Sequence, residues 1–209
     1  MTGKGKTRIL IVDDHYLVRL GLVALIHTKD DMQVVAEASD GKQAVALYEK
    51  HGPDLVLMDT RMPIKDGIEA MVEIRKGHPQ ARILMLTAFE GDVDIRRALE
   101  AGACGYVLKR STSEVLIPAI RAVARGEHWV PAEIATKLDA KKSFESLTLR
   151  EVEVLKQLAK GLGDKQIAEV LAITEYTARD HLKNIRAKLR VADRTEAVTV
   201  ALQRGIIHL

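Results

Sequence analysis

Three carboxylates and one lysine stand directly after short apolar stretches of the chain. Asp13 and Asp14 follow TRILIV, Asp59 follows LVLM, and Lys109 follows GYVL. Clustered carboxylates repel one another unless a cation neutralises them, and hard oxygen ligands suit Mg²⁺. A carboxylate beside a metal-bound phosphoryl group can act as a nucleophile. Asp59, which is flanked by a strand-like stretch and the loop TRMP, is therefore our candidate for phosphoryl transfer.

Smaller residues complete this group. Thr87 and Ala88 follow the apolar stretch RILML. The Thr87 hydroxyl can donate a hydrogen bond to one phosphoryl oxygen, and the Lys109 ammonium can pair with another. His15 is a further candidate metal ligand beside the acidic pair, but the preference of Mg²⁺ for oxygen favours a structural role for it.

The elements that must position these residues alternate over the first 125 residues. The pattern predicts an α/β fold, a (βα)5 doubly wound parallel sheet with helices on both faces. In such a sheet ligands bind at the carboxyl ends of the strands, so we expect the residues above to meet at one edge. Strands are predicted at 7–12, 32–38, 55–58, 82–87 and 105–108, and helices at 17–28, 41–51, 68–77, 93–101 and 113–125.

The pattern changes after Gly126. Pro131 and a weakly amphipathic stretch predict a linker with a short helix over residues 127–145. The remainder is helical throughout, which predicts a small all-α four-helix domain over 146–209 after a first domain over 1–126. Helices are predicted at 148–160, 165–171, 175–190 and 194–203, with capping residues Thr148, Thr174 and Asp193.

The positive charge is concentrated in the second domain. Residues 1–140 carry 19 Lys and Arg against 20 Asp and Glu, whereas residues 141–209 carry 13 against 9. This excess suggests a nucleic-acid partner. No apolar stretch reaches the ~18 residues of a membrane helix, and one cysteine cannot form an internal disulfide, so we expect a cytoplasmic protein with no membrane contact.

The helices at 165–171 and 175–190, joined by a tight turn, have the arrangement of a helix-turn-helix, whose second helix enters the major groove of double-stranded DNA. Arg179 and Lys183 lie four residues apart on one face and suit the acceptors of guanine. Asp180 must accept from cytosine or pair with Lys183 or Asn184.

Two roles are expected on this helix-turn-helix. Arg179, Asp180 and Lys183 are expected to read bases, whereas Lys165, Arg186 and Lys188 are expected to meet phosphates. The residues placed on the face opposite the core are Tyr176, Arg179, Asp180, Lys183, Asn184 and Lys188. The full expected DNA-binding set is Lys165, Thr174, Tyr176, Arg179, Asp180, Lys183, Asn184, Arg186 and Lys188.

Two known families share these motifs. Through VDDH, LMDTRMPIKDG, MLTA and GYVLK, the first 125 residues resemble the receiver domain of two-component response regulators. Residues 147–207 resemble the LuxR-type DNA-binding domain, with Ala172 where glycine often makes the turn. Together they resemble the NarL/FixJ family of response regulators, which implies a transcription regulator and not a metabolic enzyme.

The resemblance implies specific roles at the acidic site. Asp59 would be the phosphoacceptor for a sensor histidine kinase or a small phosphodonor. Asp14 would bind Mg²⁺ directly, Asp13 through water, and Arg61 through its backbone carbonyl. The residues that would bind the phosphoryl group or relay its arrival are Thr87, Ala88, Tyr106 and Lys109, with Ala88 leaving room and Tyr106 turning inward.

The resemblance also implies how phosphorylation acts. It would release the second domain from the first, promote a homodimer that matches paired half-sites on promoter DNA, or both. The helix at 194–203 is the dimer-forming element of the family. Its small apolar residues Ala197, Val200 and Ala201 permit that role, but they would serve an internal core equally well.

Three other functions compete with this interpretation. A phosphatase of the haloacid dehalogenase type needs a second Asp two residues after the nucleophile as general acid, and Arg61 stands there. A DNA-binding protein whose receiver has lost phosphorylation is disfavoured by the complete set of acids, Thr87 and Lys109. A receiver that acts only through protein partners is the third alternative.

Overall fold

A computed structural model describes residues 5–88, 91–131 and 147–207, and the chain forms two compact units that divide near residue 132. The first unit contains a five-stranded parallel sheet in the order β2-β1-β3-β4-β5. Its strands are β1 (Thr7–Val12), β2 (Met32–Ala38), β3 (Leu55–Asp59), β4 (Ile83–Thr87) and β5 (Gly105–Leu108).

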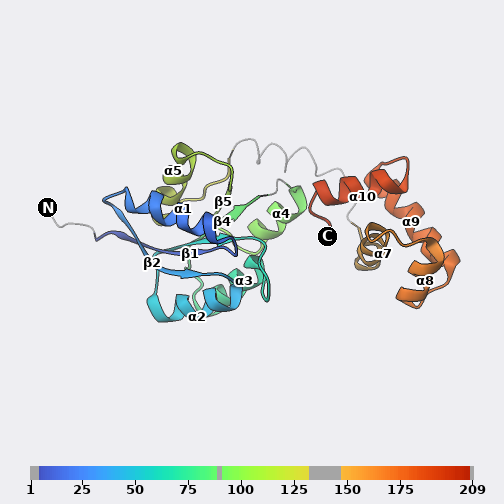
Figure 1. Ribbon diagram of the computed structural model, residues 1–209, viewed down its shortest axis with the longest axis horizontal. Coiled ribbons are helices and arrows are strands. Elements are labelled where there is room, and N and C mark those ends of the chain that lie inside the picture. Colours follow the sequence, from blue (N-terminus) through green and yellow to red (C-terminus); the bar gives the residue numbers. More distant parts are fainter. Residues whose placement is uncertain (1–4, 89–90, 132–146, 208–209) are drawn as a thin grey trace. The chain divides into compact units, whose positions relative to one another are not determined.

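Helices cover both faces of this sheet. Helices α1 and α5 lie on one face, and α2 and α3 lie on the other (Figure 1). The α/β fold is therefore confirmed, and each predicted element lies within one residue of its observed bounds. The helices are α1 (Tyr16–His27), α2 (Gly41–His51), α3 (Gly67–Gly77), α4 (Asp92–Glu100) and α5 (Ser113–Ala124).

The central strands are buried on both faces because their apolar residues are continuous. Every residue of β3 and β4 is buried. Ile9 and Ile11 of β1 pack in one cluster with Ile117 and Ile120 of α5. Because β1, β3, β4 and β5 run parallel, their carboxyl ends meet at one edge of the sheet, where the loops with the predicted site residues begin.

The outer edge of β5 is covered by the chain that follows α5. Trp129 forms an isolated parallel bridge with Gly105. The Trp129 N–H donates to the Cys104 carbonyl at 3.0 Å, and the Tyr106 N–H donates to the Trp129 carbonyl at 2.9 Å. Most of the linker predicted over 127–145, including its short helix, lies outside the described residues.

The described part of the second unit, residues 147–207, contains four helices, as predicted. Thr148 opens the first of them with a reciprocal capping box to Glu151, and Thr174 and Asp193 cap the last two. Within the described ranges, no helix has the length and apolar character needed to cross a membrane. The four helices are α7 (Leu149–Ala159), α8 (Asp164–Leu171), α9 (Glu175–Leu189) and α10 (Arg194–Gln203).

The turn between α8 and α9 depends on Ala172, which has a left-handed backbone at φ 52° and ψ 47°. A Cβ atom is unfavourable in this conformation, whereas glycine adopts it freely. We expect Ala172→Gly to raise the unfolding free energy of the second unit by about 0.5–1 kcal/mol in urea titrations. Ala187→Gly, at an exposed position in the last turn of α9, should lower it by about 0.5 kcal/mol. A loss of stability in Ala172→Gly would contradict this account of the turn.

Candidate functional site

The carboxyl ends of β1, β3 and β5 form an acidic site around one lysine. The Lys109 Nζ lies 2.7 Å from Asp59 Oδ2 and 2.7 Å from Asp13 Oδ2. Asp13 is 0% and Asp59 3% exposed, so both carboxylates are held away from bulk water. One ammonium therefore offsets two buried carboxylates, which leaves the site with excess negative charge.

The titration of these groups reflects their burial. Burial raises the pKa of Asp59 above its ordinary value; Lys109 opposes the rise in part, and the Asp13 carboxylate adds to it. Burial alone would lower the pKa of Lys109, but its contacts with Asp13 and Asp59 outweigh that effect and raise its pKa. Lys109 is therefore firmly protonated, and an added cation would favour the ionised form of Asp59.

Asp14 and His15 form the exposed side of the site. Ligand atoms of Asp13, Asp14, His15 and Asp59 all lie within 4.8 Å of one another. The His15 Nδ1 lies 2.7 Å from Asp14 Oδ1, and the His15 backbone N–H donates to Asp13 Oδ1 at 2.9 Å. Three carboxylates of this kind are the oxygen donors that Mg²⁺ prefers, so the residues fit the predicted metal.

Thr87 lies at the end of β4 and is 1% exposed. Thr60, which the sequence reasoning did not identify, donates its hydroxyl hydrogen to Thr87 Oγ1 at 3.2 Å. The Lys109 N–H donates to the Thr87 carbonyl at 2.7 Å, which joins the threonine to the lysine of β5. Ala88 follows as an exposed residue.

Arg61 and Tyr106, two further predicted site residues, lie at the rim of the site and in the protein interior, respectively. The Arg61 backbone N–H lies 3.4 Å from Asp59 Oδ1, which puts Arg61 at the rim of the site. Tyr106 is fully buried, so the inward position that we expected to follow phosphorylation is the one that it has in this structure.

Gly67, the first residue of α3, is a site residue that the sequence reasoning missed. A Cβ atom there would lie 1.8 Å from the Asp59 carbonyl oxygen and 3.0 Å from Met58 Cγ. The Gly67 N–H also donates to the Thr60 carbonyl at 3.1 Å. Glycine is therefore required for the loop after Asp59 to close over β3. In the sequence, the Asp66-Gly67 pair was the signal that could have indicated this turn.

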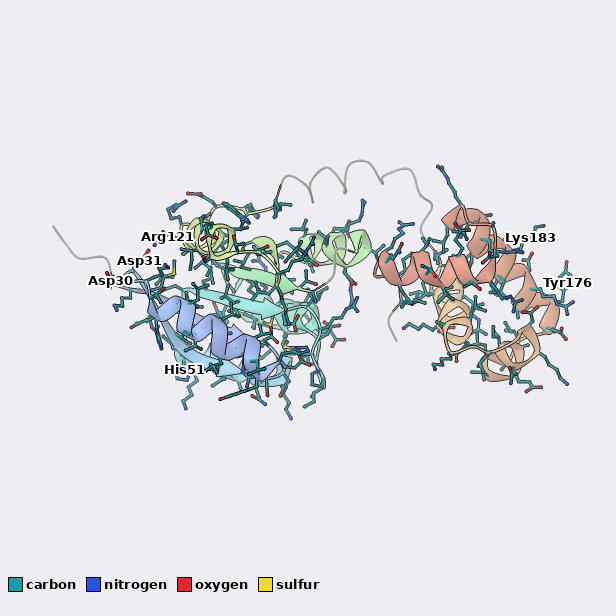
Figure 2. The ribbon with its side chains drawn as sticks, turned by 45° about the horizontal axis from the view of Figure 1, so that its top comes forward. Asp30, Asp31, His51, Arg121, Tyr176 and Lys183 are labelled. Carbon is teal, nitrogen blue, oxygen red and sulfur yellow. The ribbon has the colours of Figure 1, made fainter. Side chains whose placement is uncertain are left out.

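The second candidate site is the outer face of α9. Tyr176 is 82% exposed, and Tyr176 and Lys183 project into solvent from this helix (Figure 2). Asn184 donates to Asp180 Oδ2 at 3.4 Å, so Asp180 has one of the two partners proposed for it. Lys165 is exposed at the start of α8, and the Thr174 hydroxyl accepts from the Thr177 N–H at 3.1 Å as a helix cap.

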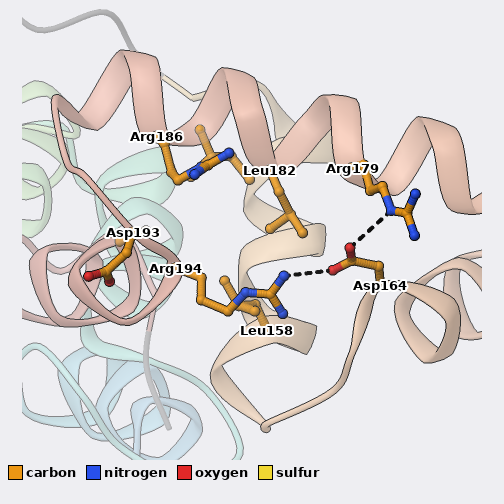
Figure 3. Close-up of a pocket in the computed structure, with 9 residues that line it drawn as sticks. Leu158, Asp164, Arg179, Leu182, Arg186, Asp193 and Arg194 are labelled. Atoms are coloured by element: carbon orange, nitrogen blue, oxygen red, sulfur yellow. Dashed lines mark hydrogen bonds and ion pairs between the residues drawn. The ribbon is translucent and has the colours of Figure 1, made fainter.

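Arg179 and Arg186 line a cleft between α9 and α10 (Figure 3). Arg179 Nε lies 3.3 Å from Asp164 Oδ2, and Arg179 also pairs with Glu175. An Arg186 N–H lies 3.5 Å from the Ala192 carbonyl. Ion pairs that involve exposed arginines of this kind contribute little to stability, about 0–1 kcal/mol.

Lys188 does not lie on the outer face, and that expectation is wrong. Its Nζ is 2.8 Å from Oε2 of Glu151 at the start of α7, and its side chain is 22% exposed. Glu151 is only 4% exposed and also accepts from the Thr148 N–H at 2.7 Å. The long aliphatic stem of lysine lets the ammonium reach back across the helix to a buried carboxylate. This contact makes Lys188 a partly buried residue that links α9 to α7.

This ion pair gives the second unit a defined pH dependence. Burial raises the pKa of Glu151, but Lys188 and Thr148 outweigh it and lower the pKa below the ordinary 4.5. The stabilisation is therefore present above pH 4.5 and is lost as the pH falls through the lowered pKa. We expect Lys188→Met to cost about 1–3 kcal/mol at pH 7 and to weaken this acid dependence, as measured by urea unfolding at several pH values. The exposed Lys183→Met is the control, and equal effects of both changes would contradict the role of the pair.

The small residues of α10 belong to the core of the second unit. Ala197 is 1% and Ala201 0% exposed, and both pack with Leu155 and Ile185. Of the two alternatives for these residues, the structure therefore supports the internal core. Val200 is only partly buried and is not part of this cluster, so an α10 interface would have to use Val200 and exposed residues such as Thr195 and Thr199.

Comparisons with known proteins agree with this architecture. Residues 9–121 match the response regulator receiver domain, and residues 145–201 match the bacterial regulatory proteins of the luxR family. The response regulator protein VraR of Staphylococcus aureus is 40% identical over 206 residues, which cover 96% of this chain and 99% of VraR.

Two solved structures have the same fold. The response regulator ChrA of a heme-sensing two-component system is 37% identical, with a TM-score of 0.60 and coverage of 98% and 100% of the two chains. RcsB from Salmonella enterica serovar Typhimurium, solved bound to a promoter, is 24% identical with a TM-score of 0.71 over 94% and 98%, which shows a shared fold alone. The chain thus belongs to the response regulators that join a receiver domain to a LuxR-type DNA-binding domain, a family of transcription regulators and not of metabolic enzymes.

Proposed function

We propose that this response regulator controls transcription through phosphorylation of Asp59 by a sensor histidine kinase. The observation that carries the proposal is the pairing of Lys109 with both Asp59 and Asp13 at the end of the sheet. A buried carboxylate that shares one lysine with a second carboxylate is prepared for the arrival of a cation and an anionic phosphoryl group. The borders proposed for the two domains, at residues 126 and 146, remain predictions.

The geometry of the chain supports a distinct role in the transfer for each residue of the acidic site. Carboxylates of Asp13, Asp14 and Asp59, with the Arg61 carbonyl, would hold Mg²⁺, which when bound neutralises charge between the carboxylates and the incoming phosphoryl oxygens. An Asp59 oxygen attacks phosphorus while the bond from phosphorus to the donor nitrogen breaks. Lys109 then pairs with a phosphoryl oxygen in place of its contact with Asp59.

Thr87 and Tyr106 would transmit the phosphorylation of Asp59 to the surface of the receiver domain. The Thr87 hydroxyl exchanges its partner Thr60 for a phosphoryl oxygen, and the exposed Ala88 leaves the path open. This movement would hold Tyr106 in the buried position that it already has and bias the surface formed by α4 and β5. The biased surface then releases the DNA-binding domain, promotes a homodimer, or both.

DNA binding is assigned to α9. Its exposed Tyr176, Lys183 and Asn184, with Arg179 beside them, form the side of the helix-turn-helix that faces away from the core. Residues near the start of a recognition helix reach base edges, and we expect Lys165 and Arg186 to contact phosphates. A dimer would present two such helices to paired half-sites about one helical turn apart.

Two experiments on the full-length protein test this proposal. Intact-mass measurement after incubation with acetyl phosphate and Mg²⁺ should show one added phosphoryl group, and peptide mapping should place it on Asp59. Selection from a random DNA library should return a sequence that is bound in a salt-sensitive way. A protein that takes up phosphoryl and selects no DNA would instead support a receiver acting through protein partners. One that selects DNA without phosphoryl uptake would support a receiver that has lost phosphorylation.

Lys183 and Lys165 should affect DNA binding in different ways. We expect Lys183→Ala to reduce discrimination between the selected site and a site changed at one base pair by roughly 5- to 150-fold, because a base contact is lost. Lys165→Ala should weaken all sequences about equally and reduce the salt dependence, because only a phosphate contact is lost. Titrations of both variants with labelled DNA measure the difference, and uniform weakening by Lys183→Ala would contradict its base-reading role.

A further inference from the structure

Asp164, the first residue of α8, holds two arginines from neighbouring helices. Its Oδ2 lies 3.3 Å from Arg179 Nε, and its Oδ1 lies 3.1 Å from Arg194 Nη2 (Figure 3). The Asp164 side chain is 19% exposed, whereas those of Arg179 and Arg194 are 65% and 54% exposed. A mostly buried carboxylate therefore fixes two more exposed guanidinium groups where α8, α9 and α10 meet.

The bonds that Arg179 makes leave its outer donors unused. A guanidinium has five N–H donors in a rigid plane. Asp164 accepts from Nε, and Glu175 accepts from Nη2. Within the described chain, no residue accepts from the remaining donors of Arg179, which include the Nη1 group and form the tip of the fork. The O6 and N7 atoms of guanine accept two parallel bonds from such a fork.

Arg179 also shares its side of α9 with two exposed residues. Tyr176 precedes it by three positions and Lys183 follows it by four, and this spacing places all three along one side of a helix. Tyr176 and Lys183 project into solvent (Figure 2). The tip of Arg179 is therefore held beside the residues to which DNA binding is assigned.

We propose that Asp164 is a positioning residue that fixes Arg179 for reading guanine, a role that rests on the proposed DNA-binding function. A free arginine side chain has many rotamers and pairs with phosphates of any sequence. Holding it in one geometry lowers the entropy that is lost on binding to a base and directs the fork to the groove. The negative charge of Asp164 also repels phosphates. Asp164 thus lowers general affinity for DNA and raises discrimination.

The two effects of Asp164 have opposite signs, which separates this role from a merely structural one. We expect Asp164→Asn to raise affinity for unrelated DNA about twofold, because one repulsive charge is removed. The ratio of affinities for the selected site and a site with its guanine replaced should fall about two- to tenfold. Glu169→Gln removes a charge from an exposed position of the same helix, so it should raise general affinity and leave that ratio unchanged.

A double-mutant cycle tests whether Asp164 acts through Arg179. In an Arg179→Ala background, Asp164→Asn should cause no further loss of discrimination. Circular dichroism checks folding, and Asp164→Ser, with a residue suited to helix starts, replaces Asp164→Asn if that variant loses helical content. Unchanged discrimination in Asp164→Asn, or a loss that persists in the Arg179→Ala background, would overturn the role of Asp164 alone. A wild-type chain that selects no sequence would overturn it together with the proposed function.

Discussion

Asp59→Asn is expected to take up no phosphoryl group from acetyl phosphate and Mg²⁺ under conditions where the wild-type protein is fully modified. The amide cannot act as the nucleophile, although it preserves the shape of the buried side chain. Intact-mass measurement over time gives the phosphorylation rates of the wild type and the variant. Titration of labelled DNA with this variant, with and without the phosphodonor, should show that its DNA binding no longer responds to the phosphodonor.

The variant should not fail through misfolding. Because burial raises the pKa of Asp59, the ionised carboxylate costs stability at neutral pH: the stability is greatest below its ordinary pKa and falls as the pH rises through the raised value. Asp59→Asn removes this cost, so its unfolding free energy without metal should exceed that of the wild type. Asp30→Asn, at an exposed acid (Figure 2), is the matched control and should be phosphorylated normally. Uptake by Asp59→Asn at the wild-type rate would disprove the phosphoacceptor assignment.

Gly67→Ala should have the largest effect on stability. Its new Cβ would lie 1.8 Å from the Asp59 carbonyl oxygen, so the backbone of the loop or of β3 has to move. We expect the unfolding free energy of the receiver to fall by about 3 kcal/mol. Displacement of Asp59 by about 1 Å should also slow phosphorylation by roughly 100-fold. Urea unfolding and intact-mass kinetics measure the two effects.

Gly21→Ala is the matched control for this change. Gly21 lies on the exposed side of α1, and a Cβ there would meet no atom within 4 Å. Alanine is favoured over glycine inside a helix, so this variant should gain about 0.5–1 kcal/mol and keep its phosphorylation rate. If Gly67→Ala behaved like Gly21→Ala, the close passage of the loop over Asp59 would be disproved.

The sequence alone predicted the receiver fold and the meeting of Asp13, Asp59 and Lys109. Buried parallel strands are apolar along their whole length, and the first polar residue after each strand must lie at the same edge of the sheet. The Thr148 and Glu151 capping box was equally readable, because its residues are three positions apart and interact within one turn.

Contacts between distant segments were not predictable in this way. The helical pattern placed Lys188 among polar neighbours, but Glu151, its partner, is 37 positions away in the chain. The need for glycine at position 67 arises because the loop folds back onto the Asp59 carbonyl, a closure that no local pattern encodes. Likewise, the small size of Ala197 and Ala201 suits a core and an interface equally, and only packing distinguishes the two.

The most direct test of the central claim measures how phosphorylation and DNA binding are coupled. Labelled DNA carrying the selected sequence is titrated with the full-length protein, with Mg²⁺ and with or without beryllofluoride as a phosphoryl analogue. We predict that the analogue tightens binding by roughly 5- to 150-fold in the wild type and leaves Asp59→Asn unchanged. Equal affinities of the wild-type protein in the two conditions, with the analogue bound at Asp59, would contradict phosphorylation control.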